Sequence, residues 1–155
     1  MNASTTDRFE KEILLKAPRP QVWQAISQAE SFGKWFGVNL KGQVFTAGAS
    51  VQGPITIPDY EHVVFDVLIV TLEPERYLAF RWHPYAVEPG VDYASEPTTL
   101  VEFTLEEVPG GTLLKVAESG FDQLPPHRRE EAFHMNGQGW AAQLIHIHEY
   151  VQTPG

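Results

Sequence analysis

The stretch PPHRREEAFHMNGQGWAAQLIHIHEYVQ, residues 125–152, decides how this chain folds. It begins with two prolines and continues without another to its end, which is long enough for about seven turns of helix. On a helical wheel, a narrow arc of large apolar side chains lies opposite a mostly polar arc. The apolar arc contains Phe133, Trp140, Leu144, Ile147 and Val151, and the opposite arc contains Glu131, Gln138, Ala142, His146 and Glu149. This pattern predicts a long C-terminal helix lying on an apolar surface.

The segments before this helix supply that surface as a series of strands. Segments 98–107 and 112–119 are joined by Pro109-Gly110-Gly111, which predicts a hairpin. Further toward the N-terminus, alternating or apolar runs predict strands over 8–16, 38–45, 49–57, 61–72 and 77–83. Two short helices are predicted after the first strand, one from Pro20 with Val22 and Ile26 on one face, and one over 30–35.

The order of elements, a strand, two short helices, six strands and a long helix, indicates an α+β fold rather than a βαβ repeat. The 155 residues match the size of one domain. We therefore expect a single domain over 1–155, with flexible ends at 1–6 and 153–155.

Composition excludes several classes of function. No cysteine is present, so disulfides, thiolate metal sites and cysteine nucleophiles are ruled out. The formal net charge is −9 and the basic residues form no stripe, which argues against nucleic acid and anionic membranes as partners. The first residues lack the pattern of a secretory signal and no long apolar run occurs, so a cytoplasmic location is expected.

Histidines on the last predicted helix invite a metal interpretation, but their spacing does not fit one. Two ligands on one helix should lie three or four positions apart. His127 and His134 are seven positions apart, and His146 and His148 are two apart. No phosphate-binding glycine loop is found either. We expect no metal site and no cofactor.

Four segments carry a family resemblance in their order along the chain. They are FGKWF at 32–36, YLAFRW at 77–82, ESGF at 118–121 and GWAAQL at 139–144. Together they resemble landmarks of the AHSA-like family, bacterial single-domain relatives of the C-terminal domain of the activator of heat shock protein 90 ATPase. The resemblance implies the START-like (SRPBCC) helix-grip fold, a curved antiparallel sheet of six or seven strands wrapped around a long C-terminal helix. The eukaryotic activator also has an N-terminal chaperone-binding domain, for which this sequence has no room.

A helix laid across a bent sheet favours an apolar cavity between the two, and such cavities bind small molecules. Gly137 and Gly139, unusual inside a helix, would permit close approach of the sheet or of a ligand. The residues expected to line the cavity or bind its ligand are Trp23, Trp35, Phe36, Phe65, Phe80, Trp82, His83, Tyr85, Phe103, Glu118, Phe133, Asn136, Trp140 and Leu144.

Glu118 has two interpretations. It continues the inward phase of Thr112, Leu114 and Val116, yet at a strand end it is expected at the cavity rim in water, with Arg81 in a surface ion pair. The alternative makes Glu118, His83, Tyr85 or Asn136 polar contacts that orient a ligand or act as acid and base, as in related ring cyclases.

Three functions follow from these expectations. The leading hypothesis is non-enzymatic binding of a small apolar or aromatic molecule, with access near Phe36, the loop 84–97 and the N-terminal end of the last helix. The second is an enzyme resembling polyketide cyclases and aromatases, with Glu118 and a neighbouring His or Tyr as acid and base. The third is a co-chaperone of heat shock protein 90.

Overall fold

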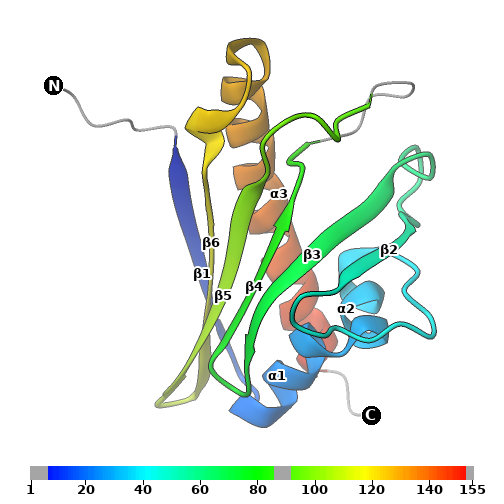
Figure 1. Ribbon diagram of the computed structural model, residues 1–155. Helices are drawn as coiled ribbons and strands as arrows, with labels where there is room; N and C mark the ends of the chain where they lie inside the picture. The colour runs from blue at the N-terminus through cyan, green and yellow to red at the C-terminus, as the bar shows by residue number, and fades with distance from the viewer. Residues whose placement is uncertain (1–6, 86–91, 153–155) are drawn as a thin grey trace, which may run out of the picture.

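The computed structural model describes residues 7–85 and 92–152, and within them one antiparallel sheet curves around a long helix (Figure 1). The sheet has six strands in the order β1-β6-β5-β4-β3-β2. The expected flexible ends and part of the loop 84–97 fall outside the described residues. In chain order the elements are β1 (Arg8–Leu15), α1 (Arg19–Ser27), α2 (Ala29–Phe36), β2 (Ser50–Pro54), β3 (Val64–Glu73), β4 (Tyr77–Trp82), β5 (Thr99–Val108), β6 (Gly111–Ser119), the 3-10 turn η1 (Phe121–Gln123) and α3 (Pro126–Gln152).

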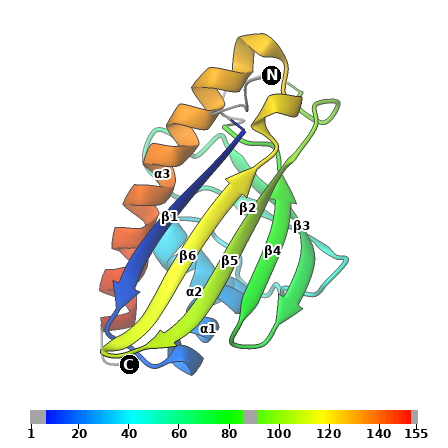
Figure 2. The same cartoon turned by 90° about the vertical axis from the view of Figure 1, so that its left-hand side faces the viewer.

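This arrangement confirms the predicted α+β helix-grip fold. α3 lies along one face of the sheet, and α1 and α2 pack against the same face near the C-terminal half of α3 (Figures 1 and 2). The predicted phase of β3 is confirmed, because Phe65, Val67 and Ile69 are buried while Asp66 is exposed. A bulge between Ile69 and Thr71 shifts the register with β4.

The predicted strand over 38–45 is wrong. Among the described residues, its one ladder contact is the isolated bridge between Val38 and Ile55. Gly42 adopts a left-handed conformation with φ 79°, which turns the chain. Leu40 and Phe45 are buried in the core instead of alternating across a strand. Packing of this segment against the rest of the interior therefore overrides its strand-like pattern.

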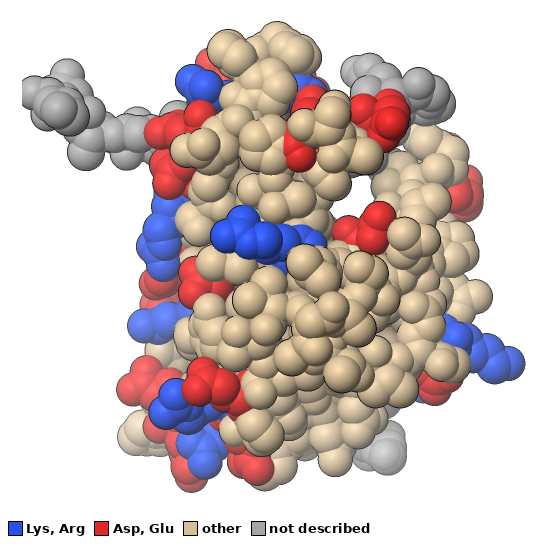
Figure 3. Space-filling model, viewed as in Figure 1, with Lys and Arg blue, Asp and Glu red and all other residues tan. Residues whose placement is uncertain are grey.

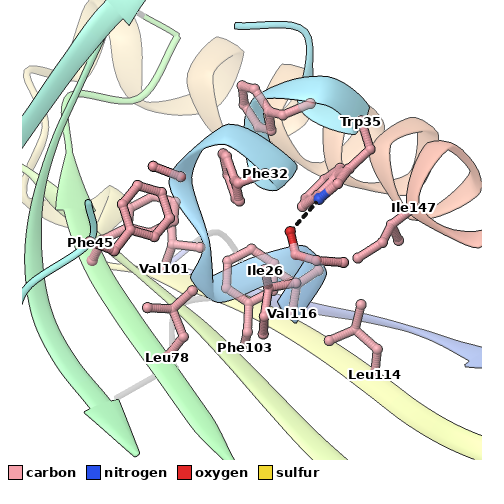
Figure 4. Packing of buried hydrophobic residues seen from close by; sticks show 14 of the residues in the cluster. Ile26, Phe32, Trp35, Phe45, Leu78, Val101, Phe103, Leu114, Val116 and Ile147 are labelled. Carbon is pink, nitrogen blue, oxygen red and sulfur yellow. Dashed lines mark hydrogen bonds between the residues drawn. The ribbon is translucent and has the colours of Figure 1, made fainter. Parts of the chain in front are cut away.

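The core between α1, α2 and the sheet is apolar. Ile26 and Phe32 from the short helices contact a cluster that includes Val101 and Phe103 of β5 (Figure 4). Trp35 is also buried there, and its indole N–H donates to the backbone carbonyl of Ala25 at 2.8 Å. This end of the interior satisfies its polar indole group with a neighbouring backbone oxygen.

The predicted apolar arc of α3 faces the sheet for most of its length. Trp140, Leu144, Ile147 and Val151 are buried. Phe133, one end of the arc, is half-buried and packs in a smaller cluster with Phe9 and Phe121. In the described part of the chain, no helix is long and apolar enough to cross a membrane.

Candidate functional site

The candidate site lies at the end of the sheet where β4 and β6 finish and β5 begins. Trp82 is the last residue of β4, Thr99 is the first of β5, and Glu118 is the last but one of β6. Because these neighbouring strands are antiparallel, the register brings Trp82 opposite Thr99, and Glu118 opposite Val101. All three side chains meet beneath the first half of α3, which supplies Asn136 and Trp140.

Glu118 is completely buried, with none of its surface exposed. One carboxylate oxygen, Oε2, accepts hydrogen bonds from the Trp82 indole at 2.9 Å and from the Thr99 hydroxyl at 2.6 Å. The other, Oε1, accepts from the Trp140 indole at 2.9 Å. The Asn136 amide nitrogen lies 3.1 Å from Oε1 and 3.0 Å from Oε2, so it bridges both oxygens.

The expectation that Glu118 lies at a rim in water is therefore wrong. β6 is an interior strand between β1 and β5, and α3 closes over its inner face with Asn136 and Trp140. Four donors replace the water that the carboxylate loses, which offsets part of the cost of burying it. Arg81 is exposed on the outer face, as expected, but the ion pairs found among the described residues do not include the one predicted for it.

Burial dominates the electrostatics of Glu118. Loss of solvent raises the pKa of its carboxyl group above the ordinary value of 4.5, although the hydrogen bonds from Thr99, Trp82, Trp140 and Asn136 act in the opposite direction. The Thr99 hydroxyl can accept a hydrogen bond as well as donate one. The 2.6 Å contact between Thr99 and Oε2 therefore suits both the ionised and the protonated acid.

Aromatic rings surround this polar centre. The ring centroids of Phe36, Trp82 and Trp140 lie 5.7 to 6.1 Å from one another. Phe65, Phe80 and Phe103 extend the contacts away from Glu118 toward Phe32. The space where the sequence predicts a cavity thus holds rings in contact with one another.

The structure places the other predicted residues in different surroundings. Trp23, Trp35 and Leu144 pack in the main core, and Tyr85 packs beside Phe133 in the smaller cluster. The ring Nε2 of His83 lies 3.0 Å from the backbone carbonyl oxygen of Glu96. Of the predicted site residues, Trp82, Asn136 and Trp140 gather on Glu118 through hydrogen bonds.

Thr99 is the site residue that the sequence analysis missed. A signal for it exists, because the inward alternation of Leu105, Phe103 and Val101 reaches Thr99 when extended by one more step. Its hydroxyl on an otherwise apolar face marks a position that needs a buried hydrogen-bond partner.

One flank of α3 separates Glu118 from solvent. Asn136, Gly139 and Gln143 lie on this flank at helical spacing, and the Gln143 amide donates to the backbone carbonyl of Phe36 at 2.8 Å. A Cβ added at Gly139 would meet no atom within 4 Å, so the space beside it is open. Asn136 and Trp82 are partly exposed. Figure 3 shows a gap in the surface near the beginning of β3.

Arg128 fastens the segment after β4 to the start of α3. Its guanidinium donates to the backbone carbonyls of Pro84 and Tyr85 at 2.9 and 3.0 Å. It also forms an ion pair with Glu96, with an N–O distance of 2.8 Å and both side chains largely buried. These bonds fix the chain that follows Trp82.

Over residues 7–85 and 92–152, no group of His, Asp and Glu has the arrangement of a metal site.

Comparisons with known proteins agree with this architecture. A Mesorhizobium loti protein superposes with a TM-score of 0.71 at 21% identity, covering 94% of this chain and 96% of that one. An Arthrobacter aurescens protein gives a TM-score of 0.76 at 17% identity, covering 97% and 88%. DynU16, from the dynemicin biosynthetic locus, gives 0.69 at 26% identity, and the match covers 95% of this chain but 48% of DynU16.

No curated protein matches the sequence. A family model does, over residues 16–152, and its description is "Activator of Hsp90 ATPase homolog 1-like protein". The match spans β6, η1 and all of α3, and hence Glu118 and all of its hydrogen-bond partners. The chain therefore belongs to the family of activator of Hsp90 ATPase homolog 1-like proteins.

Proposed function

We propose that this protein binds a small, largely aromatic molecule between α3 and the end of the sheet, with Glu118 holding the polar end of that molecule. The observation that carries the proposal is the complete burial of Glu118 among aromatic rings, with hydrogen bonds from uncharged groups. A buried carboxylate is costly, and in a structural role it is normally paired with a cation. Ligand sites are lined mainly by apolar side chains with a few convergent polar groups, and this end of the interior has that composition.

The ligand would approach along the open flank of α3. Asn136 and Trp82 cover Glu118 on this side, and both are partly exposed. Because rings already occupy the interior, binding requires one of these two side chains to rotate. The rotation breaks hydrogen bonds to Glu118, and the polar end of the ligand together with the burial of its ring would have to offset that loss. The rings of Phe36 and Trp82 would then pack against the apolar body of the ligand.

A structural neighbour adds support of a general kind. DynU16, which is similar over 95% of this chain, comes from a locus for dynemicin biosynthesis. A protein of this fold in a biosynthetic locus is consistent with a fold that binds small molecules.

Binding can be tested with a fluorescent apolar probe, N-phenyl-1-naphthylamine, and two tryptophan variants of α3. Gly139→Trp places a large ring in the open space beside Asn136, whereas Gln138→Trp places the same ring on the exposed face of the same helix. We expect the probe to bind wild type and Gln138→Trp equally, and Gly139→Trp at least about tenfold more weakly, a loss of about 1.4 kcal/mol. No binding to wild type, or equal binding to both variants, would overturn the proposal.

Acid–base catalysis is the second candidate, because the raised pKa of the buried Glu118 suits a general acid. A cyclase-like reaction needs a second titratable group on the ligand, whereas the hydrogen-bond donors to Glu118 are indoles, a hydroxyl and an amide. This composition favours binding over catalysis. Deuterium exchange at the carbon next to the carbonyl of 2-tetralone would decide: acceleration by wild type that Glu118→Gln abolishes would establish proton transfer.

The family description also suggests a chaperone partner. Stimulation of Hsp90 ATPase by the purified chain tests this third function directly. An effect retained in Gly139→Trp would place the contact on the outer surface rather than at Glu118.

A further inference from the structure

The Asn136 amide bridges the two carboxylate oxygens of Glu118. Its nitrogen is nearly equidistant from both carboxylate oxygens, at 3.1 and 3.0 Å. A doubly hydrogen-bonding nitrogen between two carboxylate oxygens has the geometry that a bound primary amine adopts. The site is thus shaped around an N–H donor rather than an acceptor.

Asn136 is also the donor that can leave most easily. Thr99 and Trp140 are buried, and Trp82 belongs to the aromatic cluster. Asn136 is partly exposed on the flank of α3, and one turn further along the helix, Gly139 leaves open space. Rotation of the Asn136 side chain toward solvent would remove one hydrogen bond from each carboxylate oxygen of Glu118 without moving the backbone, while the bonds from Trp82, Thr99 and Trp140 remain.

When Glu118 is ionised, none of its hydrogen-bond partners balances its charge. The groups that donate to Glu118 come from β4, β5 and α3, and they are Trp82, Thr99, Asn136 and Trp140, all neutral. An ionised Glu118 consequently has dipoles around it but no counter-ion among these partners. An ammonium group would supply both the hydrogen bonds that Asn136 now gives and the missing positive charge. The net charge of −9 also favours the approach of cations over anions.

We propose that the ligand class is an organic amine with an aromatic or apolar body, whose ammonium group replaces the Asn136 amide on the carboxylate of Glu118. This inference rests on the binding function proposed above and specifies its polar end. The body of the amine packs against Phe36 and Trp82, and the nitrogen reaches Glu118 from the flank of α3. Organic anions are excluded by repulsion from the same carboxylate.

Probes that differ only in their polar group separate the contribution of the amino group to binding from that of the phenyl group and the chain. Wild type is titrated at neutral pH by calorimetry with 2-phenylethylamine, 2-phenylethanol and 3-phenylpropionate, which share a phenyl group and a short chain. We expect the amine to bind at least about tenfold more tightly than the alcohol, a difference of about 1.4 kcal/mol, and the anion to bind most weakly. Glu118→Gln should bring the amine and the alcohol to similar affinity.

Asn136→Ala is expected to change the affinity for the amine in the direction opposite to Glu118→Gln. It removes the group that competes with the amine, so the amine should bind several-fold more tightly, and its affinity should rise by a larger factor than that of the alcohol. This variant also keeps the test decisive if Glu118→Gln fails to fold, since weaker amine binding by Asn136→Ala would overturn the inference.

The outcomes distinguish this inference from the proposed function. Equal binding of the amine and the alcohol, or tighter binding of the anion, overturns the amine assignment and leaves the apolar site intact. An amine preference that Glu118→Gln retains assigns the effect to the acidic surface and also overturns it. If neither these probes nor N-phenyl-1-naphthylamine bind wild type, both proposals fall together.

Discussion

The two ends of the interior bury tryptophans in opposite ways. At the α1–α2 end, Trp35 donates to the backbone carbonyl of Ala25, which lies ten residues away along the chain. At the other end, Trp82 and Trp140 both donate to the carboxylate of Glu118. The first arrangement uses an acceptor that the backbone already provides, whereas the second buries an ionisable group. Stability alone favours the first arrangement, and the second is consistent with the binding role that we propose for Glu118.

The polar end is therefore the part of the molecule in which the proposed binding function and stability would oppose each other. Replacing a buried ionic group by a well-packed apolar side chain is often neutral or stabilising, but removing one of its partners is costly. Substitutions around Glu118 should accordingly change the free energy of unfolding through lost hydrogen bonds as well as lost packing, whereas substitutions around Phe32 should change it through packing alone. The following predictions run from the largest expected effect to the smallest.

Trp140→Ala should destabilise the protein more than any other single truncation at the polar end. It removes a buried ring between α3 and the sheet and takes one donor from Glu118, at a cost of about 3–5 kcal/mol. Phe32→Ala at the apolar end should fall in the same range, through the cavity alone. Urea unfolding monitored by circular dichroism measures both. A loss below about 1 kcal/mol for Trp140→Ala would show that the ring is not buried.

Substituting phenylalanine for tryptophan isolates the hydrogen bond from most of the packing. Trp140→Phe removes a donor to a carboxylate, and we expect a cost of about 1.5–3 kcal/mol above neutral pH. Trp35→Phe removes a donor to a neutral carbonyl, and about 0.5–1.5 kcal/mol is expected. Equal losses in chemical denaturation would mean that the two ends of the interior are energetically alike.

Much of the fold was predictable because apolar periodicity reports which face of an element is buried. The arc Trp140, Leu144, Ile147 and Val151 and the alternation in β3 both lie as expected. The segment 38–45 was not predictable in this way, since Leu40 and Phe45 are buried by contacts outside any strand ladder. Periodicity shows which face of an element is buried, but it does not show which residues pack against that face.

The candidate site shows the same limit. The inward phase of Glu118 follows from Thr112, Leu114 and Val116, yet its complete burial does not. That burial depends on donors 18 and 22 positions later in the chain, which reach Glu118 only when α3 folds across the sheet. A position at a strand end next to a loop is expected to be exposed, but α3 crosses the sheet there and buries Glu118. Tertiary contacts of this kind carry no local sequence signal.

The smallest expected effect is the pH dependence that Glu118 confers on the polar end. Because burial raises the pKa of Glu118, the folded protein holds this proton more tightly than the unfolded chain does. The free energy of unfolding should therefore fall as the pH rises above the ordinary value of 4.5, and level off above the folded pKa. One proton limits the slope to about 1.4 kcal/mol per pH unit.

Urea unfolding over a series of pH values, with wild type compared with Glu118→Gln, isolates this contribution from that of the surface carboxylates. The stability of wild type relative to Glu118→Gln should decrease with rising pH, while Phe32→Leu at the apolar end should keep the wild-type profile. Asn136→Ala removes a donor to the ionised form and should extend the decrease to higher pH, which serves if Glu118→Gln does not fold. A relative stability that rises with pH would show that the four donors outweigh desolvation and hold Glu118 ionised in the folded protein.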